Sequence, residues 1–416
     1  MRSIFDQYDA PENRLTHALG CCLERDPRLL RQFIRWVCPG AGVPAAKLDV
    51  LEQQVPGVPS ASWDEDEPQG LPDLWIHDGD NWALLVESKV KAKASLRQLH
   101  RHIRTAKRSG FADVTLLLVA PSRPAHRLRG VTYRTWPEVY EWCRRQAARS
   151  EWAKCVAEYM EIAEVRMLAD GYLGDQPLTR FDGIPFGLDH PYSYREAKRV
   201  LRLALAELRK RPDLRSLGMD PTGKGRPAIT GKEGASVWDF LALKEAQGKP
   251  NFTACPHLTL GIQARRVLVI VTLPNAVLAV MRRRLSELGL RGFAQLVAEV
   301  AGGVTRAVRP IKGARPFLEV IQRHYPAQRA QAIEDARLEF DPRTAGFGAG
   351  SRVKNQPQWL AATFDALGAK RSNLQVGIGA IMPYGDPKIP SRGILDVVAE
   401  VWVACRPWLQ VLLSEK

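Results

Sequence analysis

The chain has 416 residues, of which 45% are apolar and 25% charged, and it carries a formal net charge of +15. This length and composition fit a globular protein of about two or three domains and exclude a disordered or fibrous chain. The seven cysteines are scattered and form no C-x-x-C pair, so they indicate neither a disulfide framework nor a zinc site. We see no signal-peptide pattern and no apolar stretch suited to a membrane span, and we expect a cytoplasmic protein without membrane contact.

The basic charge is concentrated in the second part of the chain. Residues 1–170 carry 24 Lys and Arg against 23 Asp and Glu, whereas residues 171–416 carry 36 against 22. Such an excess is typical of proteins that bind the phosphate backbone of nucleic acid, although basic charge can also serve solubility alone. We therefore expect a nucleic-acid partner and assign its binding mainly to the second part.

The first predicted helix runs from Pro11 to about Glu24, because proline is favoured in the first turn of a helix. Its apolar residues recur at helical spacing at Leu15, Ala18, Leu19, Cys22 and Leu23. Glu12 lies on the same side, about 60° from Leu15, so its carboxylate is expected to point inward. A role in stabilising the helix dipole is equally consistent with its place in the first turn. A second helix from Pro27 to Val37 and a strand from Leu48 to Val55 follow.

A β-hairpin pattern comes next. Asp73 opens the short apolar run Leu74–Ile76, and a second apolar run, Trp82–Val86, ends at Glu87. The polar residues between the two runs, with Gly79 at their centre, are typical of a hairpin turn. In this register Asp73 pairs beside Val86, and its carboxylate lies close to that of Glu87.

The end of the second hairpin strand carries the residues with the clearest chemistry. Glu87 and Lys89 are two apart and share one face of the strand, while Ser88 points to the other face. Two carboxylates and an ammonium on one face are costly without a partner, and a divalent metal is such a partner. Mg²⁺ prefers hard oxygen ligands, and a neighbouring lysine can stabilise charge on a phosphate. The alternative is an exposed ion-pair cluster on a hairpin.

A basic amphipathic helix is predicted from Leu96 to Lys107, with Ser95 as its N-cap. Its apolar stripe consists of Leu96, Leu99, Ile103 and Ala106. About 150° away lies a second stripe, which can bind phosphates or simply face solvent, formed by Arg97, Arg101, Arg104 and Arg108. Gln98 lies on the flank between the stripes, and His100 and His102 are expected at the surface.

The remaining elements of this part are two strands, Val114–Ala120 and Val131–Trp136, and two helices, Pro137–Arg149 and Glu151–Asp170. The order helix, strand, strand, strand, helix, strand predicts a three-layer α/β domain over residues 1–170.

Over about the first 165 residues the chain resembles the PD-(D/E)XK nuclease superfamily, with Pro72-Asp73 and Glu87-Ser88-Lys89 as the two halves of the motif. The resemblance implies a restriction-endonuclease-like core of αβββαβ order with a mixed sheet. It also implies Mg²⁺, with Mn²⁺ as a substitute, bound by Asp73, Glu87 and the Ser88 carbonyl, and Lys89 as the water-activating or charge-stabilising group. By the same resemblance Glu12 would complete the metal site, and Gln98 would orient the water or the backbone.

Residues 171–192 are rich in Gly, Pro and Asp and are predicted to be a linker. Beyond them we predict a basic α+β domain, residues 193–416, that binds nucleic acid or senses a trigger. Its predicted helices are 193–211, 275–288, 291–300, 316–324, 356–367 and 394–413, and its predicted strands are 237–243, 257–262, 267–272 and 374–382. The helix 275–288 carries Arg282, Arg283 and Arg284 near its C-terminal end, where they can bind nucleic acid or stabilise the dipole.

The resulting hypothesis is a metal-dependent endonuclease that cuts DNA, and the resemblance further suggests restriction or anti-phage defence. A homo-oligomer or partner proteins of a defence system would fit that role. A nuclease of the same fold acting on RNA or branched DNA would share every residue named here. A catalytically silent nucleic-acid-binding scaffold is the alternative from another class.

Overall fold

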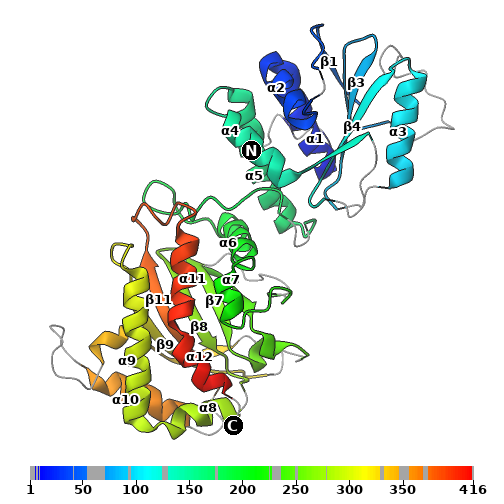
Figure 1. The fold of residues 1–416 in the computed structure, drawn as a ribbon. Helices are drawn as coiled ribbons and strands as arrows, with labels where there is room; N and C mark the ends of the chain where they lie inside the picture. Colours follow the sequence, from blue (N-terminus) through cyan, green and yellow to red (C-terminus); the bar gives the residue numbers. More distant parts are fainter. Residues whose placement is uncertain are drawn as a thin grey trace. The chain divides into compact units, whose positions relative to one another are not determined.

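The structure is a computed structural model, and it describes residues 5, 8, 10–40, 42–53, 71–91, 95–123, 130–173, 177–223, 225–226, 236–248, 252–277, 279–327, 332–345, 356–368 and 373–414. The chain divides into two units, Met1–Arg180 and Phe181–Lys416 (Figure 1). This division falls inside the segment 171–192. Leu178 packs into the core of the first unit, whereas Phe181 packs into the core of the second.

The first unit is built on a five-stranded mixed sheet with the strand order β1-β2-β3-β4-β5. The strands β1 (Asp49–Glu52), β2 (Leu74–His77) and β3 (Trp82–Ser88) are antiparallel neighbours, and β4 (Asp113–Ala120) and β5 (Val131–Thr135) continue the sheet in parallel. Leu74 pairs with Val86, so the register predicted for the hairpin is confirmed.

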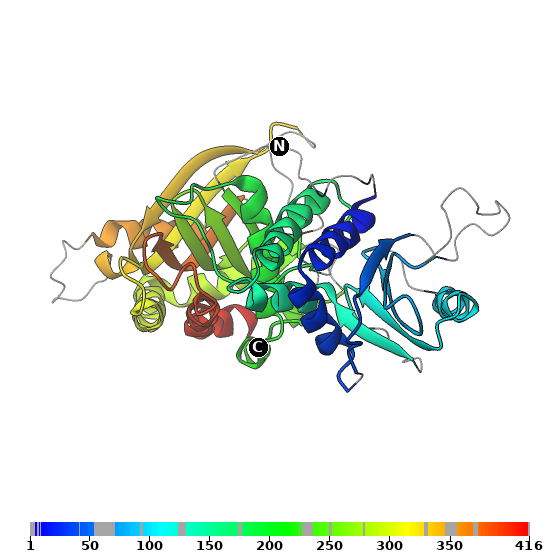
Figure 2. The same ribbon diagram turned by 90° about the horizontal axis from the view of Figure 1, so that it is seen from above.

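Helices cover both faces of this sheet, as Figure 2 shows. One face packs against α1 (Pro11–Arg25), α2 (Pro27–Val37), α4 (Trp136–Gln146) and α5 (Glu151–Ala169), and the other packs against α3 (Leu96–Arg108). Because side chains alternate along a strand, Leu84 and Val86 of β3 enter the first core, while Ala83 and Leu85 enter the second. The first unit is thus a three-layer α/β domain.

Two details of α3 differ from expectation. Ser95 holds the N-cap position, but its side chain accepts no bond from the first turn of the helix. Leu96 was expected in the apolar stripe, yet it is 52% exposed. The buried stripe begins one turn later with Leu99, which joins the apolar core between α3 and the sheet.

The second unit is built on a six-stranded sheet in which every pairing is antiparallel, with the strand order β10-β9-β11-β8-β7-β6. The strands are β6 (Ser236–Ala242), β7 (His257–Gln263), β8 (Arg266–Leu273), β9 (Arg315–His324), β10 (Ile333–Phe340) and β11 (Leu374–Pro383). The helices are α6 (Tyr194–Leu208), α7 (Pro212–Ser216), α8 (Ala279–Glu287), α9 (Gly289–Val308), α10 (Pro357–Gly368), α11 (Ile394–Ala404) and α12 (Arg406–Leu413). Short 3₁₀ turns lie at Lys244–Ala246, Phe252–Ala254 and Pro342–Thr344.

Among the described helices none combines the length and apolarity needed to cross a membrane.

The second unit corrects two predictions and contains a strand for which there was no prediction. The predicted helix 316–324 is the strand β9, whose Leu318 faces the helix-covered core while Phe317 packs on the opposite face of the sheet. Both faces of β9 are buried over this stretch, so the alternation that identifies a strand is missing from the sequence. The strand β10 was not predicted at all. The predicted helix 394–413 is two helices, which separate at Cys405 because Pro407 occupies the first turn of α12.

Candidate active site

The alternation of side chains along β3 sends its last two residues to different layers. Glu87 faces α3 and is 1% exposed, whereas Ser88 faces α1 and places its Oγ 2.5 Å from Thr16 Oγ1. β3 ends at Ser88, so Lys89 extends beyond the strand, where its side chain can reach both layers. Glu87 and Ser88 therefore lie on opposite sides, as expected, whereas Lys89 contacts Glu87 on one side and Glu12 of α1 on the other.

Glu87 is held by side chains from α3 and from the end of β3. Gln98 Nε2 donates to Glu87 Oε1 at 2.8 Å, Lys89 Nζ donates to the same oxygen, and His102 Nε2 lies 3.1 Å from Glu87 Oε2. Burial opposes ionisation of Glu87, but the hydrogen bond from His102 and the charge of Lys89 outweigh it and lower the pKa of the carboxyl. Glu87 is therefore a buried, negatively charged group at neutral pH.

Lys89 carries the compensating positive charge. Its Nζ also lies 3.4 Å from Glu12 Oε1, and its side chain is 13% exposed. Burial disfavours the ammonium, yet the negative charges of Glu87 and Glu12 raise the pKa of Lys89 above its ordinary value. The backbone of Lys89 is fixed as well, because Trp136 Nε1 donates to its carbonyl at 3.0 Å.

Asp73 lies beside this pair, just before β2. Its Oδ2 accepts a hydrogen bond of 2.7 Å from the backbone N–H of Ser88. Burial and the nearby charge of Glu87 raise the pKa of Asp73 to about 7. A second negative charge next to Glu87 is therefore unfavourable without a cation, and a metal ion bound at Asp73 would relieve this repulsion.

Glu12 occupies the first turn of α1 and points inward, as its helical position predicts. Its Oε2 accepts a 3.0 Å hydrogen bond from the backbone N–H of Val90, and its Oε1 faces Lys89. Glu12 thus does not contact Glu87 directly, because the ammonium of Lys89 lies between their carboxylates.

The oxygen atoms at this site suit Mg²⁺ in kind. Asp73 and Glu87 supply carboxylates, and the Ser88 carbonyl is directed to the Asp73 side, because the N–H and C=O of a strand residue point the same way. Among the described residues, the one group of three His, Cys, Asp or Glu ligand atoms within 4.8 Å of one another is elsewhere, at His17, Cys21 and Glu52. Glu12 therefore does not converge with Asp73 and Glu87, but Mg²⁺ commonly takes only one or two carboxylates and keeps several waters.

The arginines that were predicted to bind nucleic acid fall into two groups. Arg97, Arg104 and Arg108 are exposed on α3, and Arg101 is half-buried. They share the helix that carries Gln98.

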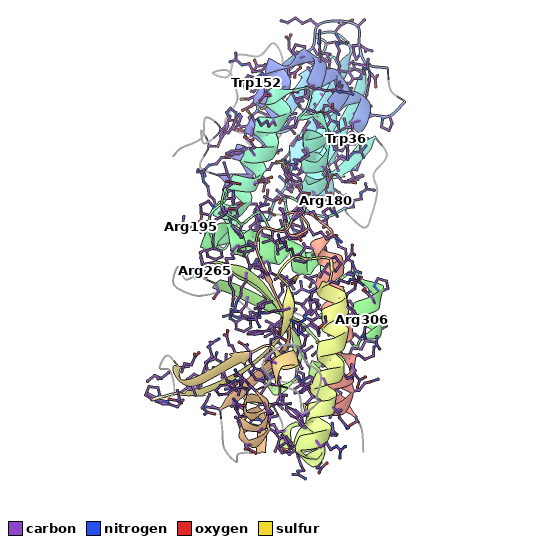
Figure 3. The ribbon with its side chains drawn as sticks, turned by 90° about the vertical axis from the view of Figure 1, so that its left-hand side faces the viewer. Trp36, Trp152, Arg180, Arg195, Arg265 and Arg306 are labelled. Atoms are coloured by element: carbon purple, nitrogen blue, oxygen red, sulfur yellow. The ribbon has the colours of Figure 1, made fainter. Side chains whose placement is uncertain are left out.

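In the second unit only the middle arginine of the predicted triplet, Arg283, is exposed. Arg282 donates to the carbonyl oxygens of Asn275 (2.8 Å) and Leu374 (3.1 Å), and Arg284 donates to that of Leu412 (2.6 Å), so both hold the fold together. Other exposed cations are spread over several elements, and Figure 3 labels Arg195 on α6, Arg265 in the β7–β8 turn and Arg306 on α9.

His102 is the main residue that the sequence reasoning missed. It was expected at the surface, but it is fully buried against Glu87. A signal was present, because Gln98 and His102 are four residues apart and therefore lie on one face of the helix. Thr16, whose hydroxyl contacts that of Ser88, was missed as well.

If Glu87 binds a metal ion as the sequence predicts, replacing His102 with alanine is expected to lower cleavage activity about 10–100-fold, the usual effect of removing a side chain that orients a metal ligand. The matched control is His100→Ala, two residues earlier on the exposed side of the same helix. Both variants would be compared in the same nucleic-acid cleavage assay, with circular dichroism to verify folding. Equal activities of the two folded variants would show that His102 does not position Glu87.

No protein-family model matches the sequence, and a search of curated proteins gave no significant match. The functional interpretation therefore depends on the residues and geometry given above.

Proposed function

We propose that this chain is a Mg²⁺-dependent nuclease of the PD-(D/E)XK superfamily that hydrolyses phosphodiester bonds in DNA. The observation that carries the proposal is the buried contact between Glu87 and Lys89 beside Asp73 at the end of β3. The element order α1-α2-β1-β2-β3-α3-β4 supports it, because apart from the additional helix α2 this order is the one expected of a restriction-endonuclease-like core. A role in restriction or anti-phage defence is part of the proposal through the same resemblance.

In this proposal Asp73, Glu87 and the Ser88 carbonyl would hold Mg²⁺, which supplies positive charge to the scissile phosphate. Lys89 donates a hydrogen bond to the phosphate, and its positive charge stabilises the negative charge that develops on the phosphate during the reaction. Alternatively, Lys89 orients the attacking water. Its raised pKa keeps the ammonium protonated for that purpose.

The other residues act through these groups. Gln98 and His102 fix the carboxylate of Glu87, since each lies within about 3 Å of one of its oxygens. Glu12 restrains the ammonium of Lys89 and is itself anchored by the backbone N–H of Val90. Such support matters because a small displacement of a catalytic group costs much of the rate.

Contacts with the substrate backbone are assigned to exposed arginines. Arg97, Arg104 and Arg108 project from α3, the helix that supplies Gln98 and His102 to Glu87. Basic side chains in such a place neutralise phosphates and hold the strand in register without reading its sequence.

The experiment that tests the proposal incubates the purified protein with supercoiled plasmid DNA and Mg²⁺. We expect nicked or linear products that disappear when a chelator is added and return with Mg²⁺ or Mn²⁺. Parallel reactions with RNA and with branched DNA identify the substrate class. If the protein cleaves RNA or branched DNA faster than plasmid DNA, that nucleic acid becomes the proposed substrate. Binding of all three nucleic acids without any product, at any divalent ion, would contradict a nuclease and favour a binding scaffold.

A further inference from the structure

A second cluster of metal-ligating side chains lies in the first unit, at the contact between α1 and β1. His17 and Cys21 are four residues apart on α1, and Glu52 is the last residue of β1. His17 Nδ1 lies 2.8 and 2.9 Å from the two carboxylate oxygens of Glu52. Cys21 Sγ lies 3.5 Å from both ring nitrogens of His17 and 4.0 Å from Glu52 Oε1.

These separations are close to those of ligands that share one metal ion. Bonds of about 2.0–2.3 Å at tetrahedral angles separate neighbouring ligand atoms by about 3.3–3.7 Å. The Cys21–His17 separation lies inside that interval, the His17–Glu52 separations lie below it and the Cys21–Glu52 separation lies above it. Small side-chain rotations would therefore allow all three side chains to reach a common ion. The sulfur needs the largest rotation, because it lies equally far from both nitrogens of the ring.

The fold makes room for the Glu52 carboxylate against α1. A Cβ added at Gly20 would come within 3.0 Å of Glu52 Oε1 and 2.7 Å of Leu74 Cδ2, so a larger residue there would push the carboxylate away from His17. Tyr8 donates a hydrogen bond of 3.0 Å to Glu52 Oε2, which fixes the orientation of the carboxylate. Polar support of this kind around a ligating carboxylate is common at metal sites.

We propose that His17, Cys21 and Glu52 bind a transition-metal ion of the zinc class at the α1–β1 contact. One nitrogen, one sulfur and one oxygen ligand suit Zn²⁺ or a similar ion and do not suit Mg²⁺, which prefers oxygen alone. Three protein ligands leave a fourth position for solvent or a further group. When the ion binds, the thiol of Cys21 gives up its proton to solvent and the thiolate becomes the ligand.

This site would brace the two elements that flank the proposed catalytic residues. α1 also carries Glu12 and Thr16, which precede His17 and contact Val90 and Ser88. Next to Glu52, the backbone N–H of Gln53 donates to the Asp73 carbonyl at 3.3 Å. An ion that links α1 to the end of β1 therefore stabilises the surroundings of Asp73. The inference itself does not depend on nuclease activity.

The test titrates Co²⁺, a spectroscopic substitute for Zn²⁺, into the reduced, metal-free, full-length protein. We expect a thiolate-to-cobalt charge-transfer band in the near ultraviolet and tetrahedral bands in the visible range, both saturating at one equivalent and both removed by Zn²⁺. Cys21→Ser is expected to abolish the near-ultraviolet band. His17→Gln and Glu52→Gln are expected to weaken binding by about tenfold or more.

Two further variants separate this site from other ligands. Cys155→Ser replaces another half-buried free cysteine of the same unit and is expected to leave the titration unchanged. Glu87→Gln is expected to leave it unchanged as well, which distinguishes the site from the proposed Mg²⁺ site. Absence of the charge-transfer band in the wild-type protein, or its persistence in Cys21→Ser, would overturn the inference. If Cys21→Ser alone fails to fold, His17→Gln and Glu52→Gln still test the inference, because both are expected to weaken metal binding as measured by the same band.

Discussion

Replacing Glu87 with glutamine is expected to lower Mg²⁺-dependent DNA cleavage by about 10²–10³-fold or more. The substitution keeps the volume of the side chain but removes the negative charge that the metal ion and Lys89 both require. Glu87 is buried, and both Lys89 and Gln98 donate to its Oε1. Single-turnover cleavage rates at saturating Mg²⁺ measure the effect, and fluorescence anisotropy checks that DNA is still bound.

Asp80→Asn provides the matched control for Glu87→Gln. Asp80 is an exposed carboxylate in the turn between β2 and β3, on the same hairpin, and its loss is expected to leave the rate unchanged. Lys89→Gln is expected to reduce cleavage to a similar extent as Glu87→Gln, but it also leaves the carboxylates of Glu87 and Glu12 without their cation, so its folding must be verified. A folded Glu87→Gln variant that cleaves like the wild type would refute the assigned site.

The candidate site could be predicted in outline because its geometry follows from local rules. The pairing of Leu74 with Val86 places Asp73 next to Glu87, and the alternation along a strand places Glu87 and Ser88 on opposite sides. These relations need only a hairpin and its register, which the turn residues indicate. The inward direction of Glu12 follows in the same way from helical spacing.

The parts that sequence could not provide depend on how separate elements pack. His102 was missed because a helical position does not reveal how much of the helix the sheet covers, and the same uncertainty led to the wrong expectation for Leu96. The prediction of a helix at β9 is wrong because the fold buries both faces of this strand, so its sequence lacks the alternation of a half-exposed strand. The cluster around Glu52 arises from the contact between α1 and β1, which neither segment specifies alone.

The apparent affinity for Mg²⁺ is expected to fall about tenfold for each pH unit below about 7, because Asp73 must lose a proton before it can bind a cation. Burial and the charge of Glu87 raise the pKa of Asp73 to about 7, so protons and Mg²⁺ compete for this carboxylate in the physiological range. Lys89 and Glu87 keep their charges over the same range, since the pKa of Lys89 is raised and that of Glu87 is lowered. Isothermal titration calorimetry between pH 5.5 and 8.5, an interval of about 1.5 units on each side of that pKa, measures the effect.

The stability of the metal-free protein provides an independent check on the same group. A carboxyl whose pKa is higher in the folded than in the unfolded state binds its proton more tightly when folded, so its contribution to stability is present at low pH and is lost as the pH rises through about 7. The asparagine side chain in Asp73→Asn cannot ionise, so this variant is not expected to lose stability in this way as the pH rises. The difference in unfolding free energy between Asp73→Asn and the wild type, measured in chelator, should therefore grow between about pH 4 and pH 7 and then level off. Parallel pH profiles for the two proteins would mean that Asp73 titrates normally, and the competition between protons and Mg²⁺ would then have to lie elsewhere.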